Sequence, residues 1–258
     1  AAFLSGRFSI ELNLAGPHVD FAIIREIVRV SLPLSGTKLA GIAARFPFLF
    51  VLGALGTNVV AAYAIGRRIV TLARMPAFGY ATASSTLVGQ ALGNDDENTA
   101  ERYGWQTFRL SLATGVILGT GVVLGARELA VLFGADNVGL TVTFIYVFSA
   151  AIVGFSISRT FQGALRGAGD TKVPFYATLV GNYAIRLPIS FLALSTGVTI
   201  TALGYTVAPG LGLGLTAVFV SIWADIYARA AINWTRYRSN RWKAIGRAGV
   251  ARARAGVD

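Results

Sequence analysis

The sequence predicts an all-α polytopic membrane protein with six transmembrane helices. Hydrophobic residues make up 54% of the 258 residues and the mean hydropathy is +0.61, which is too apolar for an ordinary soluble domain of this length. A helix needs about 20 mostly apolar residues to cross a bilayer. Six windows meet that length: 31–53, 59–91, 105–126, 138–163, 173–197 and 211–235.

The segments at the two ends of the chain are more polar than these windows. Residues 1–30 lack the basic start and small-residue cleavage site of a signal peptide, so we expect a cytoplasmic linker that leads into the first helix. His18, the only histidine, lies in this linker as an expected surface residue. Residues 236–258 are a basic tail, expected on the inner membrane surface or disordered. Residues 31–235 are therefore the membrane domain.

The second window is too long for one straight span. At 1.5 Å per residue it extends about 50 Å, whereas the hydrocarbon core is about 30 Å thick, so the helix must tilt, bend or project into the cytoplasm. Pro47, Pro76 and Pro188 lie inside windows, where each removes a backbone donor and loosens the helix. These three prolines are the hinge candidates, although a static kink that only improves packing explains Pro76 equally well.

The distribution of basic residues predicts the orientation. With six spans both termini lie on one side, and only Arg127 lies in the connectors of the opposite side. The connectors on the side of the termini hold Arg7, Arg25, Arg29, Arg102, Arg166, Lys172, Arg236, Arg238, Arg241, Lys243, Arg247, Arg252 and Arg254. This asymmetry predicts a cell-membrane protein with both ends in the cytoplasm. The net charge of +11 then indicates attraction to anionic lipid and no nucleic-acid binding.

Two glycine-rich stretches separate windows on the cytoplasmic side. GALRGAGDTKVPF, residues 163–175, lacks the G-x-x-x-x-G-K-[ST] spacing of a phosphate-binding loop, so it predicts a turn between two helices. Gly169 supplies the turn and Pro174 suits the first turn of the following helix. GQALGNDDENTAER, residues 89–102, predicts a similar turn after the second window.

These stretches carry a family resemblance. STLVGQALGNDDENTAER and GALRGAGDTKVPFYATLVGNYAIRLP resemble the C-terminal half of the multidrug and toxic compound extrusion (MATE) family. The segment FLSGRFSIELNLAGPHVDFAIIREIVRVSLP resembles the join between the two six-helix lobes of that family. Because members have about twelve spans, the resemblance implies one lobe of a two-lobe transporter. Its partner is an N-terminal six-helix lobe, on the same chain or a second one.

The resemblance also exposes a departure. In the sodium-coupled branch an acidic residue follows the proline of this lobe's first helix by about two turns, and another acid lies in its fourth helix. This sequence has Gly41 near the first place, after Pro33, and no acid between 138 and 163. Proton-coupled relatives use an aspartate in the other lobe. Elimination therefore favours a proton over sodium, and no cofactor is expected.

Basic residues inside the first two windows are candidates for a substrate or ion pathway, because ionisable groups at bilayer depth usually face a bundle interior or a wet cavity. Lys38 and Arg45 are seven residues apart and share a helix face, as do Arg67 and Arg74. If these spans pair antiparallel, Arg45 meets Arg67 and Lys38 meets Arg74. Such like-charge rungs need a wet cleft, an anionic ligand, or carboxylates on the other lobe, which would only hold the conformation.

Arg186 and Asp225 lie near the middle of the fifth and sixth windows, at similar depth and with opposite charges. A buried structural ion pair is one interpretation. The other is that Asp225 takes up a proton during a transport cycle and the pair switches with it.

Other embedded residues have simpler explanations. Arg109, Arg159 and Arg229 lie within about two turns of the cytoplasmic face and are expected to extend to the lipid headgroups. Aromatic side chains in the windows are expected to contact lipid or pack: Phe46, Phe48, Phe50, Trp223 and Tyr227.

No sequence feature supports an enzyme. The leading hypothesis is an exporter of organic compounds that works by ion-coupled antiport with alternating access. The alternatives are a flippase for lipid-linked oligosaccharides or other polyanions, and a non-transporting membrane scaffold.

Overall fold

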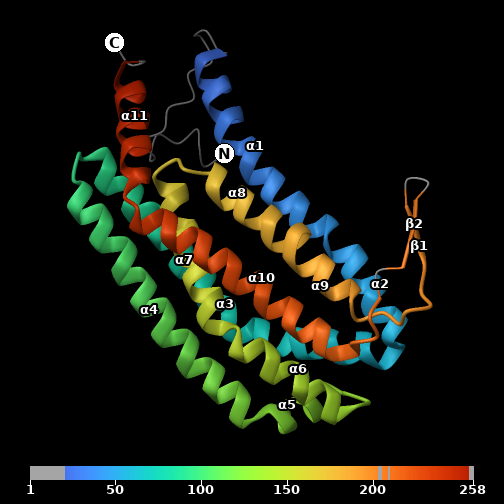
Figure 1. Cartoon of the computed structure of the whole chain (residues 1–258). Coiled ribbons are helices and arrows are strands. Elements are labelled where there is room, and N and C mark those ends of the chain that lie inside the picture. Colours follow the sequence, from blue (N-terminus) through green and yellow to red (C-terminus); the bar gives the residue numbers. More distant parts are fainter. Residues whose placement is uncertain (1–20, 203–204, 209, 256–258) are drawn as a thin grey trace, which may run out of the picture.

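The computed structural model describes residues 21–202, 205–208 and 210–255, and confirms the all-α fold class (Figure 1). His18 and most of the expected linker lie outside the described residues. In chain order the helices are α1 (Phe21–Ala43), α2 (Arg45–Leu55), α3 (Thr57–Gly93), α4 (Glu97–Leu124), α5 (Ala126–Leu132), α6 (Val138–Ala150), α7 (Ile152–Gly167), α8 (Lys172–Leu179), the π-helical η2 (Val180–Arg186), α9 (Leu187–Phe191), α10 (Gly214–Arg238) and α11 (Arg241–Ala255).

One small β-hairpin interrupts the helices between α9 and α10. Strand β1 (Ile200–Ala202) pairs antiparallel with β2 (Tyr205–Val207), with Thr201 opposite Thr206. The hairpin projects from the helices in Figure 1. It falls in the connector 198–210, where the sequence predicted a loop between two spans.

The helices lie on the six hydrophobic windows, with differences in detail. The first window is divided between α1 and α2, the fourth between α6 and α7, and the fifth continues from α8 through η2 to α9. Three segments of the described chain are long and apolar enough to span a membrane: Leu34–Leu55, Glu97–Leu124 and Gly214–Arg238. The pair α6 and α7, bent by 45°, gives a fourth if it forms one span. The count of six spans therefore stays a prediction.

Helix α3 lies at the centre of the packing. It packs against α4, α6 and α7, while α10 covers α7, α8, η2 and α9. Helix α1 packs along α8, and of the two helices of the first window the short α2 is the one that lies against the start of α3 (Figure 1). The antiparallel pairing predicted for the first two windows is thus confined to α2 and α3.

Close contact between α3 and α7 depends on glycine. A Cβ atom on Gly163 would collide with the backbone carbonyl of Ala81, and one on Gly167 with that of Ser85. Small residues allow helix backbones to approach in this way. Gly169, with φ of +79°, makes the turn to α8, and Pro174 lies in the first turn of α8, as the sequence predicted.

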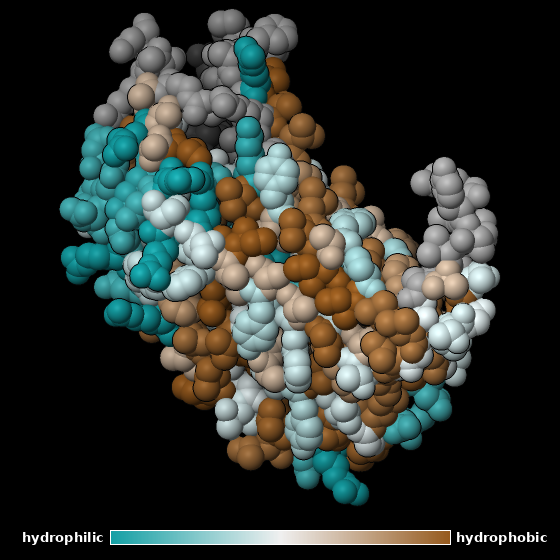
Figure 2. Space-filling view, viewed as in Figure 1, coloured by the Kyte–Doolittle hydropathy of each residue, from teal (hydrophilic) through white to brown (hydrophobic). Residues whose placement is uncertain are grey.

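The surface is apolar over most of the helical body. Large hydrophobic side chains are exposed on many helices, among them Leu32, Phe46, Leu72, Ile117, Leu124 and Tyr176. Figure 2 shows hydrophobic residues across the middle of the molecule and hydrophilic residues gathered around α11 and the turn between α3 and α4. An apolar middle of this kind suits a lipid environment.

The described part of the basic tail is mainly helical, since α10 ends at Arg238 and α11 spans Arg241–Ala255. Helix α11 follows α10 after a short turn at Asn240. Trp242 is fully buried and stacks on Tyr237 with ring centroids 5.1 Å apart. Lys243 pairs with Glu101 at 2.5 Å and Arg247 with Glu97 at 2.7 Å. These contacts attach α11 to the start of α4.

Candidate functional site

Three embedded charges meet between η2 and α10. Asp225 is fully buried, and its Oδ2 atom accepts a hydrogen bond from Arg229, one helical turn further along α10. Arg186 reaches the same oxygen at 3.9 Å. The predicted pairing of Arg186 with Asp225 is therefore present, but Arg229 is the nearer partner. Arg229 was expected to extend to the headgroups, and the structure places its guanidinium against the carboxylate one turn away.

The surroundings of this cluster fix Arg186. Its guanidinium lies 3.9 Å from the ring centroid of Phe48 and donates to the hydroxyl of Tyr63 at 3.4 Å. Cation–π contact and the hydroxyl favour the charged side chain in a buried position. The other carboxylate oxygen, Oδ1 of Asp225, has no hydrogen-bond partner. It faces Gly181, where a Cβ atom would collide with it.

The π-helical turn places Gly181 and Arg186. A π-helix is wider than an α-helix and is rare outside single turns, which often occur at functional sites. Pro188 follows directly and cannot donate a hydrogen bond to the preceding turn, so the hinge candidate marks the end of the π-helical segment. Pro47 likewise lies in the first turn of α2, just after the break at Ala44. Pro76, in contrast, lies within an uninterrupted α3.

Arg74 has a structural role that the sequence did not indicate. It donates a hydrogen bond to the backbone carbonyl of Phe148, and its guanidinium lies over the rings of Phe148 and Phe155 at 5.6 and 4.9 Å. Trp223 donates to the carbonyl of Val147 and Tyr227 to that of Ala150. The last turn of a helix leaves carbonyls without intrahelical partners, and at the end of α6 side chains from α3 and α10 bind three carbonyls.

Of the two expected like-charge rungs, the structure contradicts the one between Lys38 and Arg74. Lys38 and Arg45 are exposed. Arg67 lies over the ring of Tyr63 at 5.8 Å, while Arg74 faces α6 and α7. The predicted contact between Lys38 and Arg74 is therefore wrong in this lobe, because α1 packs against α8.

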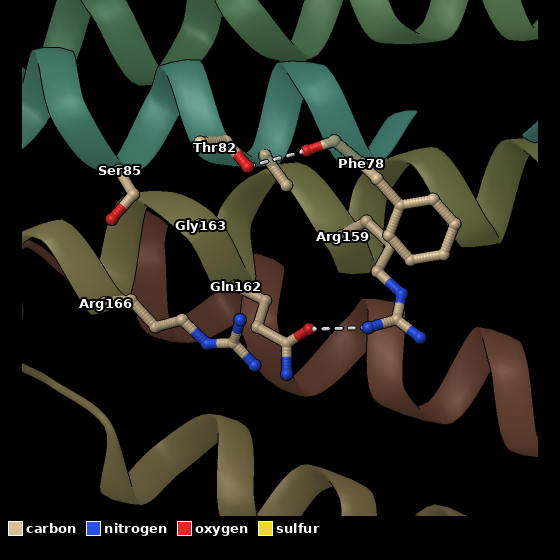
Figure 3. A pocket seen from close by; sticks show the side chains of 8 residues that line it. Phe78, Thr82, Ser85, Arg159, Gln162, Gly163 and Arg166 are labelled. Carbon is tan, nitrogen blue, oxygen red and sulfur yellow. Dashed lines mark hydrogen bonds between the residues drawn. The ribbon is translucent and has the colours of Figure 1, made fainter. Parts of the chain in front are cut away.

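A second group of polar residues lines a pocket of about 230 Å³ between α3 and α7 (Figure 3). Its walls include Phe78, Thr82 and Ser85 of α3 and Arg159, Gln162 and Arg166 of α7. Arg159 donates to the Oε1 atom of Gln162 at 3.2 Å and lies 5.1 Å from the ring centroid of Phe78. Arg159 was expected to anchor at the headgroups, but the aromatic rings hold it in this pocket.

Sequence reasoning missed Arg159, Arg166, Arg229 and Gly181 as parts of the site. Two signals were available: Asp225 and Arg229 have the i, i+4 spacing of a helical ion pair, and Arg159, Gln162 and Arg166 follow at spacings of three and four. No comparable signal marked Gly181. Among the described residues no group of three or more His, Cys, Asp or Glu side chains could hold a metal ion.

Comparison with known proteins gives a consistent result. The protein-family model described as MatE matches residues 33–192. The "Probable multidrug resistance protein NorM" of Thermotoga maritima is 28% identical over 246 residues, which cover 93% of this chain and 49% of the relative. The protein of the same name in Bradyrhizobium diazoefficiens is 26% identical over 186 residues, which cover 69% of this chain and 40% of the relative. The chain spans about half the length of these relatives.

Solved structures share the fold. A MATE protein in the bent conformation superposes with a TM-score of 0.80 at 19% identity, over 96% of this chain and 52% of the other. A MOP superfamily transporter from Pyrococcus furiosus, whose binding pocket is described as having reverse polarity that suggests different function, has a TM-score of 0.78 at 19% identity. That match covers 95% of this chain and 52% of the other.

Proposed function

The chain belongs to the MatE family of multidrug efflux transporters, and from this premise we propose that it is the C-terminal lobe of a two-lobe secondary transporter. This transporter exports organic compounds by ion-coupled antiport with alternating access. The observation that carries the proposal is the family match over residues 33–192 together with a coverage of about half of each relative.

The N-terminal lobe supplies the other half, either on the same chain or on a second one. Residues 1–30 connect the lobes in the cytoplasm, residues 31–235 form the membrane lobe, and residues 236–258 lie at the cytoplasmic face. The substrate pathway runs between the lobes, with Lys38, Arg45 and Arg67 as pathway candidates on this one. Exposure of Lys38 and Arg45 supports their place on a surface that a partner or substrate reaches.

The ion-coupling proposal centres on Asp225. It is the one acid embedded in α10, and its Oδ1 atom is buried without a hydrogen-bond partner, which leaves one oxygen free to accept a proton. Neutralising the carboxylate would release Arg186 and Arg229, so a single proton could change the contact between η2 and α10.

A second candidate is export of lipid-linked oligosaccharides or other polyanions. The surplus of interior cations favours it, since Arg74, Arg159, Arg166, Arg186 and Arg229 lie among the packed helices with Asp225 as the acid in their midst. A neutral or cationic substrate would gain nothing from that surplus.

Reconstitution of the complete two-lobe protein in proteoliposomes tests both candidates. We expect uptake of a fluorescent cationic dye into inside-out vesicles when a pH gradient, but not a sodium gradient, is imposed. Anionic lipid precursors should leave dye transport unchanged if drugs are the substrates and should compete if polyanions are. If neither the dye nor the lipid precursors were transported under a pH or a sodium gradient, the transport proposal would be overturned and a non-transporting scaffold would be favoured.

A further inference from the structure

The pocket between α3 and α7 has the character of an anion site. Arg159, Gln162 and Arg166 stand on one face of α7, and Figure 3 shows their side chains extending side by side beneath α3. The amide of Gln162 lies between the two guanidinium groups. Ser85 on α3 adds a hydroxyl group to the same wall, whereas the hydroxyl of Thr82 donates to the carbonyl of Phe78 at 3.1 Å. The lining thus offers two cations and several hydrogen-bond donors.

The positive charge of this pocket is not balanced within the described part of the chain. The charged side chains near Arg159 are those of Arg74, Arg166 and Arg229, together with the acid Asp225. That carboxylate is already paired with Arg229 and Arg186. Nε of Arg166 is buried and has no hydrogen-bond partner.

Three described acids near the cytoplasmic end pair with other basic residues. Asp170 follows α7 closely in sequence but pairs with Arg236 at 2.7 Å. Glu101 and Glu97 pair with residues of α11. Clustered like charges in a poorly solvated interior call for a compensating anion, and these carboxylates do not provide it.

The size of the pocket limits the ligand. A volume of about 230 Å³ holds on the order of seven water molecules at about 30 Å³ each. Sites for drug-sized ligands usually begin at about 300 Å³. The half-exposed ring of Phe78 gives the pocket one apolar wall. A single anionic group with a short apolar substituent fits this combination.

We propose that this pocket binds a phosphate or carboxylate head of a small amphiphile. Guanidinium groups match both heads with paired, charge-assisted hydrogen bonds, and the Arg159 contact to Gln162 keeps the amide turned toward the same space. The inference rests on the second candidate function, export of anionic molecules, and names the chemical group of such a molecule that this lobe binds.

Direct binding tests the site without transport. The chain is placed in nanodiscs of phosphatidylcholine and titrated with butyl phosphate, with butylamine as a probe of equal tail and opposite charge. We expect binding of butyl phosphate alone. Arg166→Gln should weaken it about tenfold or more, because a hydrogen-bonded charge is lost. Arg109→Gln, which removes an exposed arginine of α4 outside the pocket, should change it less than about twofold.

A second set of nanodiscs distinguishes the source of the anion. If phosphatidylglycerol displaces butyl phosphate and raises the melting temperature of the protein but not of Arg166→Gln, the head belongs to a lipid. If phosphatidylglycerol has no effect while butyl phosphate binds, the ligand is a soluble organic anion. If Arg166→Gln fails to fold, Arg166→Lys replaces it as the test. Lysine keeps the positive charge but lacks the paired N–H donors of the guanidinium, so it must weaken binding of butyl phosphate by more than about twofold and less than about tenfold.

Two results would overturn the site: no binding of either anion, or equal losses in Arg166→Gln and Arg109→Gln. Neither result touches the transport proposal, which depends on vesicle assays of the two-lobe protein.

Discussion

At the scale of single residues, the sequence made the embedded charges visible but not their partners. Asp225 was expected to pair with Arg186 because the two lie at similar depth, and the structure adds Arg229 as the closer partner. A buried carboxylate between two guanidinium groups is costly to disrupt from one side, since the charges left behind stay buried.

Asp225→Asn should therefore lower the free energy of unfolding by about 3–5 kcal/mol. Two uncompensated guanidinium groups would remain beside η2 and α10. The measurement is the midpoint of thermal or denaturant unfolding in detergent, with Glu128→Gln, an exposed acid of α5, as the matched control. Removing Arg229 as well, in Asp225→Asn with Arg229→Gln, should recover part of the loss. A single variant as stable as the unmodified chain would show that the cluster is solvated.

Arg74 gives a second prediction at this scale. Arg74→Gln should destabilise the protein by about 1–3 kcal/mol, because the carbonyl of Phe148 loses its donor at the break between α6 and α7. Arg67→Gln removes the same charge from the same helix, where the described contact is a ring at 5.8 Å, and should cost less. The measurement is the unfolding midpoint of each variant, which should fall further for Arg74→Gln than for Arg67→Gln. Unchanged stability of Arg74→Gln with altered substrate preference would instead place Arg74 in the transport cavity.

At the scale of helices, contact between α3 and α7 depends on backbone proximity. Gly163→Ala would press a methyl group against the carbonyl of Ala81, and backbone cannot move aside as a flexible side chain can. Overpacking of this kind usually costs about 1–3 kcal/mol. Gly79→Ala, on α3 in open space, is the control and should cause no loss. Thermal unfolding followed by size-exclusion chromatography compares the two variants, and equal midpoints would mean that α3 and α7 separate easily.

The described contacts of α11 include a buried aromatic contact, two ion pairs and the packing of Gly246 against Leu92 of α3. Trp242→Ala should release it, because the ring packs on Tyr237 and its Nε1 atom donates to the Tyr237 carbonyl at 2.9 Å. Loss of a buried tryptophan commonly costs about 3–5 kcal/mol. Arg247→Gln removes an exposed pair worth at most about 1 kcal/mol. Limited trypsin digestion should cut α11 rapidly in Trp242→Ala and slowly in Arg247→Gln. Similar rates in both would assign the attachment to the charges.

At the scale of the whole molecule, the hydrophobic windows predicted where the helices lie, because burial in lipid requires long apolar stretches, which are visible in a sequence. The same windows could not reveal the division of the first span at Ala44 or of the fourth at Ala151. Those breaks depend on which side chains from other helices bind the freed carbonyls, as Trp223 and Tyr227 do at α6. The packing of α1 on α8 likewise depends on three-dimensional shape.

The arrangement of the two ends of the molecule leads to the last prediction. In Figure 1 the start of α1, the turn between α3 and α4, and α11 lie at one end, while α5 and the β-hairpin lie at the other. The end with α11 carries the basic connectors, so the positive-inside rule assigns it to the cytoplasm. The chain contains no cysteine, so single cysteines can be labelled without background.

In intact cells a membrane-impermeant maleimide should therefore label Thr57→Cys, at the start of α3, and should reach Asn98→Cys, in the first turn of α4, only after permeabilisation. Both positions are exposed, so a difference in labelling reports the side of the membrane and not burial. If Asn98→Cys were labelled in intact cells and Thr57→Cys were not, the lobe would be inverted. The arginines of the pocket between α3 and α7 would then face the outside, and an anion taken from the cytoplasm could not reach them first.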